Sequence, residues 1–323
     1  MKKLFLFALF AALCCSCTES NTDENTDPNG GSNSGQTTPP DPDSDAKDVI
    51  HVPKGGMLAG ILNELGLTEP SSLKLSGTLG ISDFTTLRNI QSLEHLDISR
   101  VNLSVLPTEA FLECTNIKSV ILPNTLTAIG TQAFCLSSLV SISIPASVET
   151  IEGGAFFRCT ALQTVTFEKG SKLKTIKNGS IWSGVFESCT SLTTIEIPAS
   201  VETIRGGAFS DCTSLKTVTF EKGSQLLTVY GYYAHGAFSD CTALTTVDMS
   251  ACTQVTVIGE YAFYEDSKLQ LFKIGTRTPP SCGDNAFWGI NSYSVLKVPA
   301  GCVDAYKKAK GWKGFTTISE LDE

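Results

Sequence analysis

The sequence predicts a repeat solenoid of short parallel strands, and three observations indicate it. A phrase of the form A-F-x-x-C-T-x-L-x-x-V-x-F recurs along most of the 323 residues. Its phenylalanines are spaced 22 to 30 residues apart, a period typical of units that bury their apolar face only by stacking on neighbours. Apolar positions step by three and then by two, which indicates a tight turn followed by a short strand. The phenylalanines are Phe111, Phe134, Phe156, Phe186, Phe209, Phe238, Phe263 and Phe287.

Residues 1–17 have the pattern of a bacterial lipoprotein signal peptide. Two lysines precede an apolar run from Leu4 to Leu13, which is too short to cross a bilayer as a stable helix. The run leads into Cys-Cys-Ser-Cys, which resembles the lipobox of bacterial lipoproteins. That resemblance implies that Cys17 is acylated and begins the mature protein, with Cys15 as the alternative. Acyl chains would then hold the protein on a membrane without a spanning helix.

Residues 18–48 are predicted to be a disordered acidic tether. From Thr18 to Asp45 the only apolar residues are prolines and glycines, so the segment cannot offset its ordering entropy by burial. This tether carries most of the net charge of −9, which leaves the remainder mildly acidic and argues against a nucleic-acid partner. The acidic stretch that follows Cys17 resembles the signal by which some Bacteroidetes lipoproteins reach the outer face of the outer membrane. A solvated spacer is the alternative. The acidic residues of the stretch after Cys17 are Glu19, Asp23, Glu24 and Asp27.

The two ends of the array need caps, because a terminal coil would otherwise expose its apolar face. Residues 49–70 are predicted to form the N-terminal cap, since Leu58, Ile61, Leu62 and Leu65 have helical spacing. Residues 301–323 are predicted to form the C-terminal cap, as a short helix and tail. Trp312 is assigned to this cap rather than to a binding site.

Residues 71–300 are predicted to hold about ten coils. The A-F-x-x-C-T-x-L phrase, with proline after the strand as in Ile144-Pro145 and Ile197-Pro198, resembles the leucine-rich repeat in its BspA-like form. The resemblance implies a right-handed superhelix with a parallel β-sheet on the concave face, short turns or 3-10 segments on the convex side and helical caps. The expected strand centres are Lys74, Asp97, Ile121, Ser143, Thr166, Glu196, Thr219, Asp248, Lys273 and Lys297.

A column of cysteines follows the phenylalanines, mostly three residues after each one. Because each lies at an inward position of its coil, the column is predicted to be packing and not a disulfide or metal ladder. Cys282 and Cys302 flank the last coil, and the sequence leaves undecided whether they form a disulfide. The column consists of Cys114, Cys159, Cys189, Cys212 and Cys241.

The concave face is one candidate binding surface. Alternate strand residues should point outward from it, and they are rich in hydroxyls and acids toward the middle of the array. Because threonine also favours strands in general, a solvated face without a ligand is the alternative. The candidate residues are Thr166, Glu168, Glu196, Thr219, Glu221 and Asp248.

Two coils break the period with insertions, which often bulge as loops on a binding face. Their aromatic side chains could stack on sugar rings or anchor a protein, or instead fold back over the edge of the core. The candidate ligand-binding residues are Trp182, Tyr230, Tyr232, Tyr233 and His235.

No catalytic, metal or cofactor motif stands out in the sequence, and His51, His95 and His235 are scattered, so an enzyme is not expected. BspA-like proteins are described as adhesins, and the resemblance implies a lipid-anchored outer-membrane protein, facing outside the cell, that binds a host-matrix or bacterial protein partner. A glycan-binding accessory lipoprotein and a passive structural surface protein are the alternatives.

Overall fold

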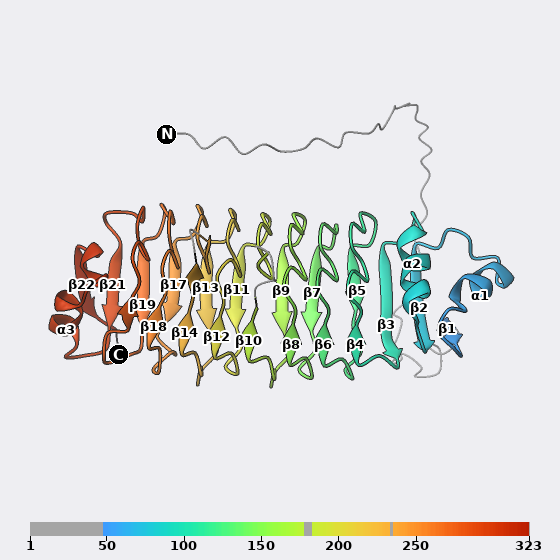
Figure 1. The fold of residues 1–323 in the computed structure, drawn as a ribbon, viewed down its shortest axis with the longest axis horizontal. Helices are drawn as coiled ribbons and strands as arrows, with labels where there is room; N and C mark the ends of the chain where they lie inside the picture. The colour runs from blue at the N-terminus through green and yellow to red at the C-terminus, as the bar shows by residue number, and fades with distance from the viewer. Residues whose placement is uncertain (1–47, 178–182, 233–234, 323) are drawn as a thin grey trace, which may run out of the picture. The chain divides into compact units, whose positions relative to one another are not determined.

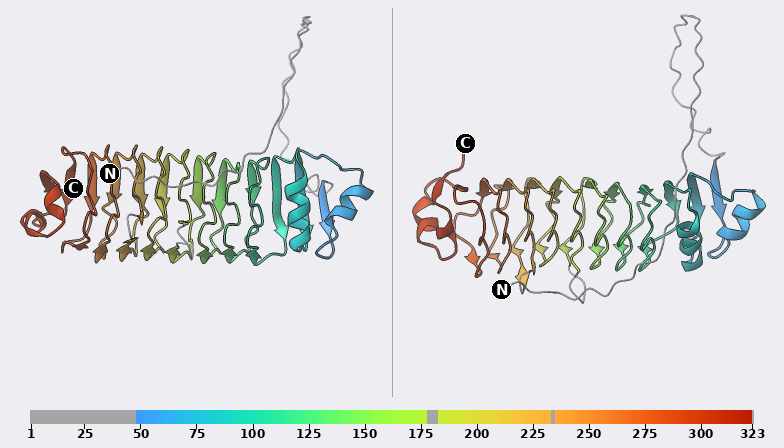
Figure 2. Two further views of the ribbon diagram at one scale, coloured as in Figure 1. Left: turned by 45° about the horizontal axis from the view of Figure 1, so that its top comes forward. Right: turned by 90° about the horizontal axis from the view of Figure 1, so that it is seen from above.

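The computed structural model describes residues 48–177, 183–232 and 235–322. These residues form a stack of short coils, coloured from blue to red along the chain (Figure 1), and Figure 2 shows the same stack from two further sides. The predicted repeat solenoid is confirmed, and all ten expected strand centres lie in strands. None of the helices in the described ranges is both long and apolar enough for a membrane span.

The first side of each coil is a strand of three to seven residues in a parallel sheet, and we call these the long strands. They form two six-stranded sheets that meet between residues 164–167 and 194–197. The first sheet contains β1 (Val49–Val52), β2 (Ser72–Gly77), β3 (His95–Val101), β5 (Ser119–Ile121), β7 (Ser141–Ile144) and β9 (Thr164–Phe167). The second contains β11 (Thr194–Ile197), β13 (Thr217–Phe220), β17 (Thr246–Met249), β19 (Leu271–Ile274), β21 (Val295–Val298) and β22 (Thr317–Glu320).

The second side of each coil is a two-residue strand, and eight of these short strands form a parallel sheet of their own. The strands are β4 (Val105–Leu106), β6 (Ala128–Ile129), β8 (Thr150–Ile151), β10 (Thr175–Ile176), β12 (Thr203–Ile204), β14 (Thr228–Val229), β18 (Val257–Ile258) and β20 (Ser281–Cys282). A small antiparallel hairpin follows β14, formed by β15 (Gly231–Tyr232) and β16 (His235–Gly236).

The third side is the A-F-x-x-C segment, which forms hydrogen-bonded turns in place of a strand. Each turn bonds to the next coil, as where the Phe134 N–H donates to the Ala155 carbonyl at 2.7 Å. Residues on either side of the phenylalanine take positive φ, as at Gln132. Adjacent turns approach so closely that a Cβ on Gly184 would lie 1.8 Å from the carbonyl oxygen of Gly207, so only glycine fits there. We call this side the turn face.

The core is a column of phenylalanine rings, one from each coil. The eight repeat phenylalanines are buried and stack in seven successive pairs, with centroids between 5.0 and 5.5 Å apart and planes within 17° of parallel. The thirty-residue coil does not interrupt the column, since Phe156 and Phe186 are 5.0 Å apart. Insertions are therefore accommodated outside the core, while the coil interior keeps one geometry.

The N-terminal cap contains a strand as well as the expected helix. Helix α1 (Leu58–Glu64) buries Leu58 and Leu62, and β1 extends the sheet beyond the first predicted coil. A second helix, α2 (Ile81–Asn89), replaces the turn segment of the first coil. The Phe84 ring meets the Phe111 ring edge-on at 5.6 Å, which ends the stacked column.

Two polar side chains of α2 join the cap to the array. Buried Asp83 accepts backbone N–H bonds from Gly56, Leu58 and Gly80 at 2.6 to 3.0 Å. Arg88 donates to the carbonyl of Glu109 at 2.6 Å, in the first turn of the turn face. Both contacts satisfy backbone groups that the end of a repeat array leaves without a neighbouring coil.

The C-terminal cap closes the other end of the column with aromatic side chains. Helix α3 (Val303–Lys308) and a 3-10 turn (Trp312–Gly314) precede β22. Trp312 is fully buried, lies 5.3 Å from the Phe287 ring and donates through Nε1 to the Pro280 carbonyl. The Tyr306 hydroxyl donates to the Thr276 carbonyl at 2.7 Å. The assignment of Trp312 to the cap is confirmed.

Candidate functional site

The outer side of the long-strand sheets carries the residues predicted for the concave face. Along each strand, buried and outward-facing residues alternate, so the predicted residues lie on one solvent side of adjacent coils. Thr166, Glu168 and Glu196 are exposed, whereas Thr219, Glu221 and Asp248 are half-buried.

Two of these acids hold the backbone of a neighbouring coil. Glu168 accepts the N–H of Ala146 at 3.1 Å, and Glu221 accepts the N–H of Ala199 at 2.9 Å. Each alanine follows the proline that ends the long strand of the preceding coil. The sequence contains a signal for this contact, because a P-A-S turn in one coil is twice followed by F-E-K-G in the next. These two glutamates have a structural role that the sequence reasoning missed.

We expect Glu221→Ala to lower the free energy of unfolding by about 1 kcal/mol, because it leaves the Ala199 N–H without its partner. Glu196→Ala is the matched control, since Glu196 is exposed on the same face, and its effect should stay within about 0.5 kcal/mol. Urea denaturation of the two variants measures the difference. Equal losses would contradict a bracing role for Glu221.

Asp248 is the third acid of this face with a partner in a neighbouring coil. Its carboxylate lies 2.9 Å from Lys273 Nζ and accepts the Ser250 hydroxyl at 2.6 Å. Partial burial opposes ionisation of Asp248, but the hydrogen bonds from Ser250 and Lys273 outweigh it and lower the pKa of the carboxyl. The charged part of the face is thus internally paired at this point.

An uncharged strip lies nearer the N-terminal end of the same face. Ile121, Ser143 and Thr166 are the outward residues at the centres of three successive strands, and we call them the central strip. Ile121 is 56% exposed. Asp97 borders the strip on one side and Glu196 on the other, so a flat patch of one apolar and two hydroxyl side chains separates two acids.

The insertion residues are only partly described. Trp182 and Tyr233 lie outside the described residues, and of Tyr232 only the backbone is described, in the hairpin with His235. Tyr230 is 40% exposed, and the guanidinium of Arg205 lies 5.3 Å from its ring centroid. Of the predicted aromatic cluster, Tyr230 is therefore the residue whose side chain can be placed.

The turn face carries three carboxyl groups near His235, of which Glu187 is buried, Asp240 half-buried and Asp211 exposed. Burial raises the pKa of Glu187, Asp211 and Asp240, and the nearby charge of His235 opposes this for all three. Glu187 accepts the N–H of Gly184 at 2.8 Å, so it braces a turn. Within the described ranges, no three His, Cys, Asp or Glu side chains are placed to hold a metal ion.

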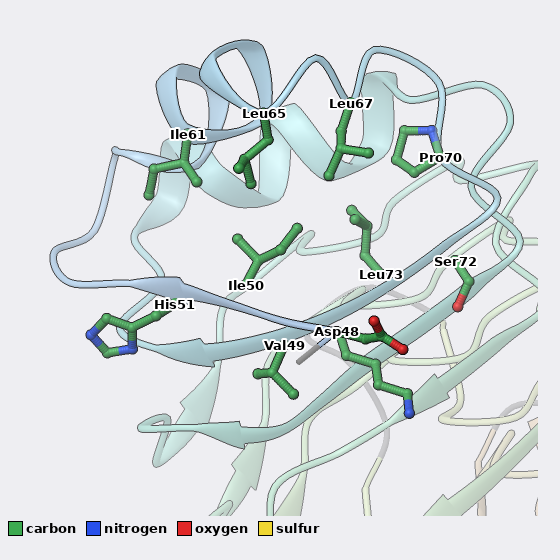
Figure 3. Close-up of a pocket in the computed structure, with 11 residues that line it drawn as sticks. Asp48, Val49, Ile50, His51, Ile61, Leu65, Leu67, Pro70, Ser72 and Leu73 are labelled. Carbon is green, nitrogen blue, oxygen red and sulfur yellow. The ribbon is translucent and has the colours of Figure 1, made fainter. Parts of the chain in front are cut away.

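A groove of about 570 Å³ lies beside the N-terminal cap (Figure 3). Ile61, Leu65 and Leu67 come from α1 and the loop after it, and they face Ile50 and Leu73 of the sheet. Leu65 is 56% exposed, so the cap does not fill the space over its own strands. The helical spacing that predicted the cap did not indicate this groove.

A second hollow, of about 610 Å³, lies beside Tyr230 at the C-terminal end of the short-strand sheet. Its lining includes Gly259, Glu260, Ser281 and Gly283, all from the two coils after Tyr230. The sequence reasoning missed this hollow. A signal for it is present in the sequence. The residue after a short strand is large at Tyr230 and becomes glycine in the next two coils, at Gly259 and Gly283.

The cysteine column is buried, as predicted, and it also satisfies backbone carbonyls. The thiols of Cys159, Cys189 and Cys212 each donate to the carbonyl of the repeat phenylalanine in the preceding coil, at 2.8 to 3.2 Å. Cys282 and Cys302 are free thiols in this structure. The sequence had left undecided whether these two cysteines form a disulfide. Burial raises the pKa of Cys282 to about 12, so its thiol is protonated at neutral pH.

Comparison with protein families gives one match, and it covers most of the chain. The model of the BspA type leucine rich repeat region matches residues 81–183 and 179–309, in six copies. Among curated proteins, no match was found.

Solved structures similar to the chain include three bacterial leucine-rich repeat proteins. One from Bacteroides ovatus is 19% identical, covers 84% of this chain and 82% of that chain, and has a TM-score of 0.40. One from T. pallidum is 24% identical, with 63% and 79% covered and a TM-score of 0.44. A leucine rich cell surface protein from Faecalibacterium prausnitzii is 20% identical, with 80% and 74% covered and a TM-score of 0.34.

Proposed function

Because this chain belongs to the BspA-type leucine-rich repeat family, we propose that it is a surface-displayed scaffold that binds a protein partner through its long-strand face. The observation that carries this proposal is the central strip. Ile121, Ser143 and Thr166 present an uncharged patch on the last three strands of the first hydrogen-bonded sheet. Twelve long strands at about 4.8 Å spacing give a face on the order of 50 Å long, enough for the roughly 800 Å² that a stable partner covers.

A folded protein suits this face better than a small molecule does. The two hollows described above lie at the N-terminal cap and along the short strands, and the central strip belongs to neither. Protein interfaces typically have many weak contacts around an apolar anchor on a flat surface. The partner we propose is a protein of the host matrix or of another bacterial surface.

Binding to a panel of purified matrix proteins and bacterial surface proteins tests the protein-binding role. Ile121→Asp should weaken binding to the partner by at least about tenfold, because it places a charge in the uncharged strip. Leu136→Asp is the control, since Leu136 is 41% exposed on the turn face. Equal weakening by both variants would place the interface elsewhere. Absence of any bound protein would favour a passive structural role.

We further propose that Cys17 is acylated and that the protein is held on the outer face of the outer membrane. The support is the sequence pattern of residues 1–27, which lies outside the described residues. Cys17→Ser should release the protein from the detergent phase into the aqueous phase in a partitioning experiment, whereas Cys15→Ser should not. The reverse result would assign the anchor to Cys15. Protease treatment of intact cells tests the outward orientation.

A further inference from the structure

The residue that follows each short strand forms a column of side chains along one edge of the stack. Neighbours in this column interact from coil to coil. Glu152 and Lys177 form an ion pair at 2.7 Å, and the Arg205 guanidinium lies 5.3 Å from the centre of the Tyr230 ring. From the third short strand to the last, the members in order are Glu152, Lys177, Arg205, Tyr230, Gly259 and Gly283, and the first two short strands are followed by Pro107 and Gly130.

The column ends at Tyr230 because the next two positions are glycine. A Cβ on Gly259 would lie 2.5 Å from the backbone nitrogen of Gly231, and a Cβ on Gly283 would lie 2.4 Å from that of Glu260. Close approach of the coils therefore excludes side chains there. The hollow of about 610 Å³ lies beside these two glycines, and Tyr230 is the aromatic residue of its lining. Arg205 covers one side of the ring, and the hollow lies toward the coils on the other.

Polar groups border the floor of this hollow. Glu260 and Ser281 are exposed and line it. The Ser281 hydroxyl donates to the Thr256 carbonyl at 3.1 Å, and its oxygen can still accept a bond. The exposed carboxylate of Glu260 supplies further acceptors. The hollow thus combines an aromatic wall, a floor of glycine backbone and hydrogen-bonding groups at the rim.

More aromatic side chains lie on the turn face in the same two coils. The Tyr261 and Tyr264 rings meet at 5.3 Å, and Tyr264 stacks on Trp288 at 5.0 Å with planes 14° apart. Trp288 is 54% exposed. This aromatic group begins two residues after Gly259, so it continues from the rim of the hollow onto the adjacent face.

We propose that the hollow and the aromatic side chains beside it bind a neutral oligosaccharide, with one pyranose ring stacked against Tyr230. The C–H groups on the face of a pyranose are weakly positive and apolar, and they match the negative face of an aromatic ring. Sugar hydroxyls donate to carboxylate and hydroxyl oxygens such as those of Glu260 and Ser281. A shallow hollow with one aromatic wall lets a sugar ring stack by one face without enclosing it.

The charges around the hollow select against acidic sugars. Glu260 lines it, Glu265 and Asp284 belong to the same two coils, and the Arg205 guanidinium lies against the Tyr230 ring on the side of the preceding coil. The nearby Lys310 is already paired with Asp284 at 3.2 Å. Sialylated or sulfated chains would meet carboxylates of the same sign, which disfavours their binding. This site is separate from the central strip, so it does not depend on the protein-binding role.

An array of neutral, sialylated and sulfated oligosaccharides, probed with the full-length protein, tests the proposal. The neutral chain with the strongest signal is then titrated by calorimetry. Tyr230→Ala should weaken its binding by about tenfold, and Tyr230→Phe, which keeps the ring, should stay within about threefold. Ser281→Trp should also weaken oligosaccharide binding, because the indole would fill the hollow from its rim while Tyr230 remains. Tyr293→Ala is the control, because Tyr293 is 84% exposed and does not line the hollow.

Three results would overturn the proposal. The first is that wild-type protein retains no oligosaccharide, or prefers acidic ones. The second is that Tyr293→Ala weakens binding as much as Tyr230→Ala. The third is that Tyr230→Ala abolishes capture of a protein partner, which would make the surface a protein interface. Ile121→Asp should leave oligosaccharide binding unchanged, so failure of this proposal and failure of the protein-binding role can be told apart.

Discussion

Replacing Phe156 with alanine is expected to lower the free energy of unfolding by about 3–5 kcal/mol, the cost of truncating a fully buried phenylalanine. The Phe156 ring lies between those of Phe134 and Phe186, at 5.1 and 5.0 Å. The cavity would therefore open at the contact between coils on both sides. The hydrogen-bonded turns that hold each ring in place limit how far the neighbours can collapse into it.

The next residue supplies the control. Phe157 is half-buried, and the Arg158 guanidinium lies 5.1 Å from the centre of its ring on the turn face. Phe157→Ala should cost less than about 1 kcal/mol, because its ring belongs to the surface and not to the column. Urea denaturation followed by circular dichroism compares the two variants. Similar losses for both would mean that the stacked column is not the main source of stability.

Replacing Asp266 with asparagine is expected to stabilise the protein at neutral pH and to remove a pH dependence of its stability. Asp266 takes the place of a cysteine in the buried column, three residues after Phe263. Its Oδ1 accepts the N–H of Cys241 at 2.9 Å. Its Oδ2 is the one buried side-chain oxygen or nitrogen in the described ranges that has no hydrogen-bond partner.

The sign of the pH dependence follows from the burial of this carboxyl. Burial raises the pKa of Asp266 well above its usual value, and the charge of Asp240 adds to the effect. The folded protein thus keeps a proton that the unfolded chain releases above about pH 4. The contribution of Asp266 to the free energy of unfolding should be flat below that pH. Above it, stability should fall by up to about 1.4 kcal/mol per pH unit until the folded pKa is reached.

Unfolding free energies measured from pH 3.5 to 8 test this prediction. Asp266→Asn and Asp266→Cys should both match the wild type near pH 3.5 and exceed it increasingly as the pH rises. Asp266→Cys also restores the thiol that donates to a phenylalanine carbonyl in other coils, such as Cys159 to Phe134. Asp211→Asn is the control, since Asp211 is exposed and its effect should be smaller. Parallel curves for wild type and Asp266→Asn would contradict a buried neutral carboxyl.

Much of the fold could be read from the sequence, because the core repeats along the chain. Phe156, Cys159 and Leu162 are buried as their spacing indicates, and the ten strand centres are correct. The first coil was less predictable. Helix α2 and strand β1 lie outside the repeat, so no periodicity marks them.

The candidate sites were predicted less well. From the sequence, Glu168 and Glu221 were expected to be ordinary solvated acids. In the structure, each accepts a hydrogen bond from a backbone N–H of the preceding coil. The expectation that Tyr230 acts with Tyr232 and Tyr233 stays a prediction, since Tyr233 and the Tyr232 side chain lie outside the described part of the chain; the described neighbours of Tyr230 are Arg205 and the hollow at Gly259. A single sequence shows what each residue is, but it does not show which residue of the next coil lies beside it.

The sequence by itself determined the coil, because apolar side chains at fixed spacing can be buried only by stacking equivalent positions on one another. The tertiary structure decided the surface. Neighbours there come from different coils, 22 positions apart for Glu221 with Ala199 and 28 positions apart for Lys174 with Glu202, and insertions change that offset from coil to coil. Tyr230 and Gly259 line one hollow because packing of the coils places them side by side, and no local sequence pattern sets that alignment.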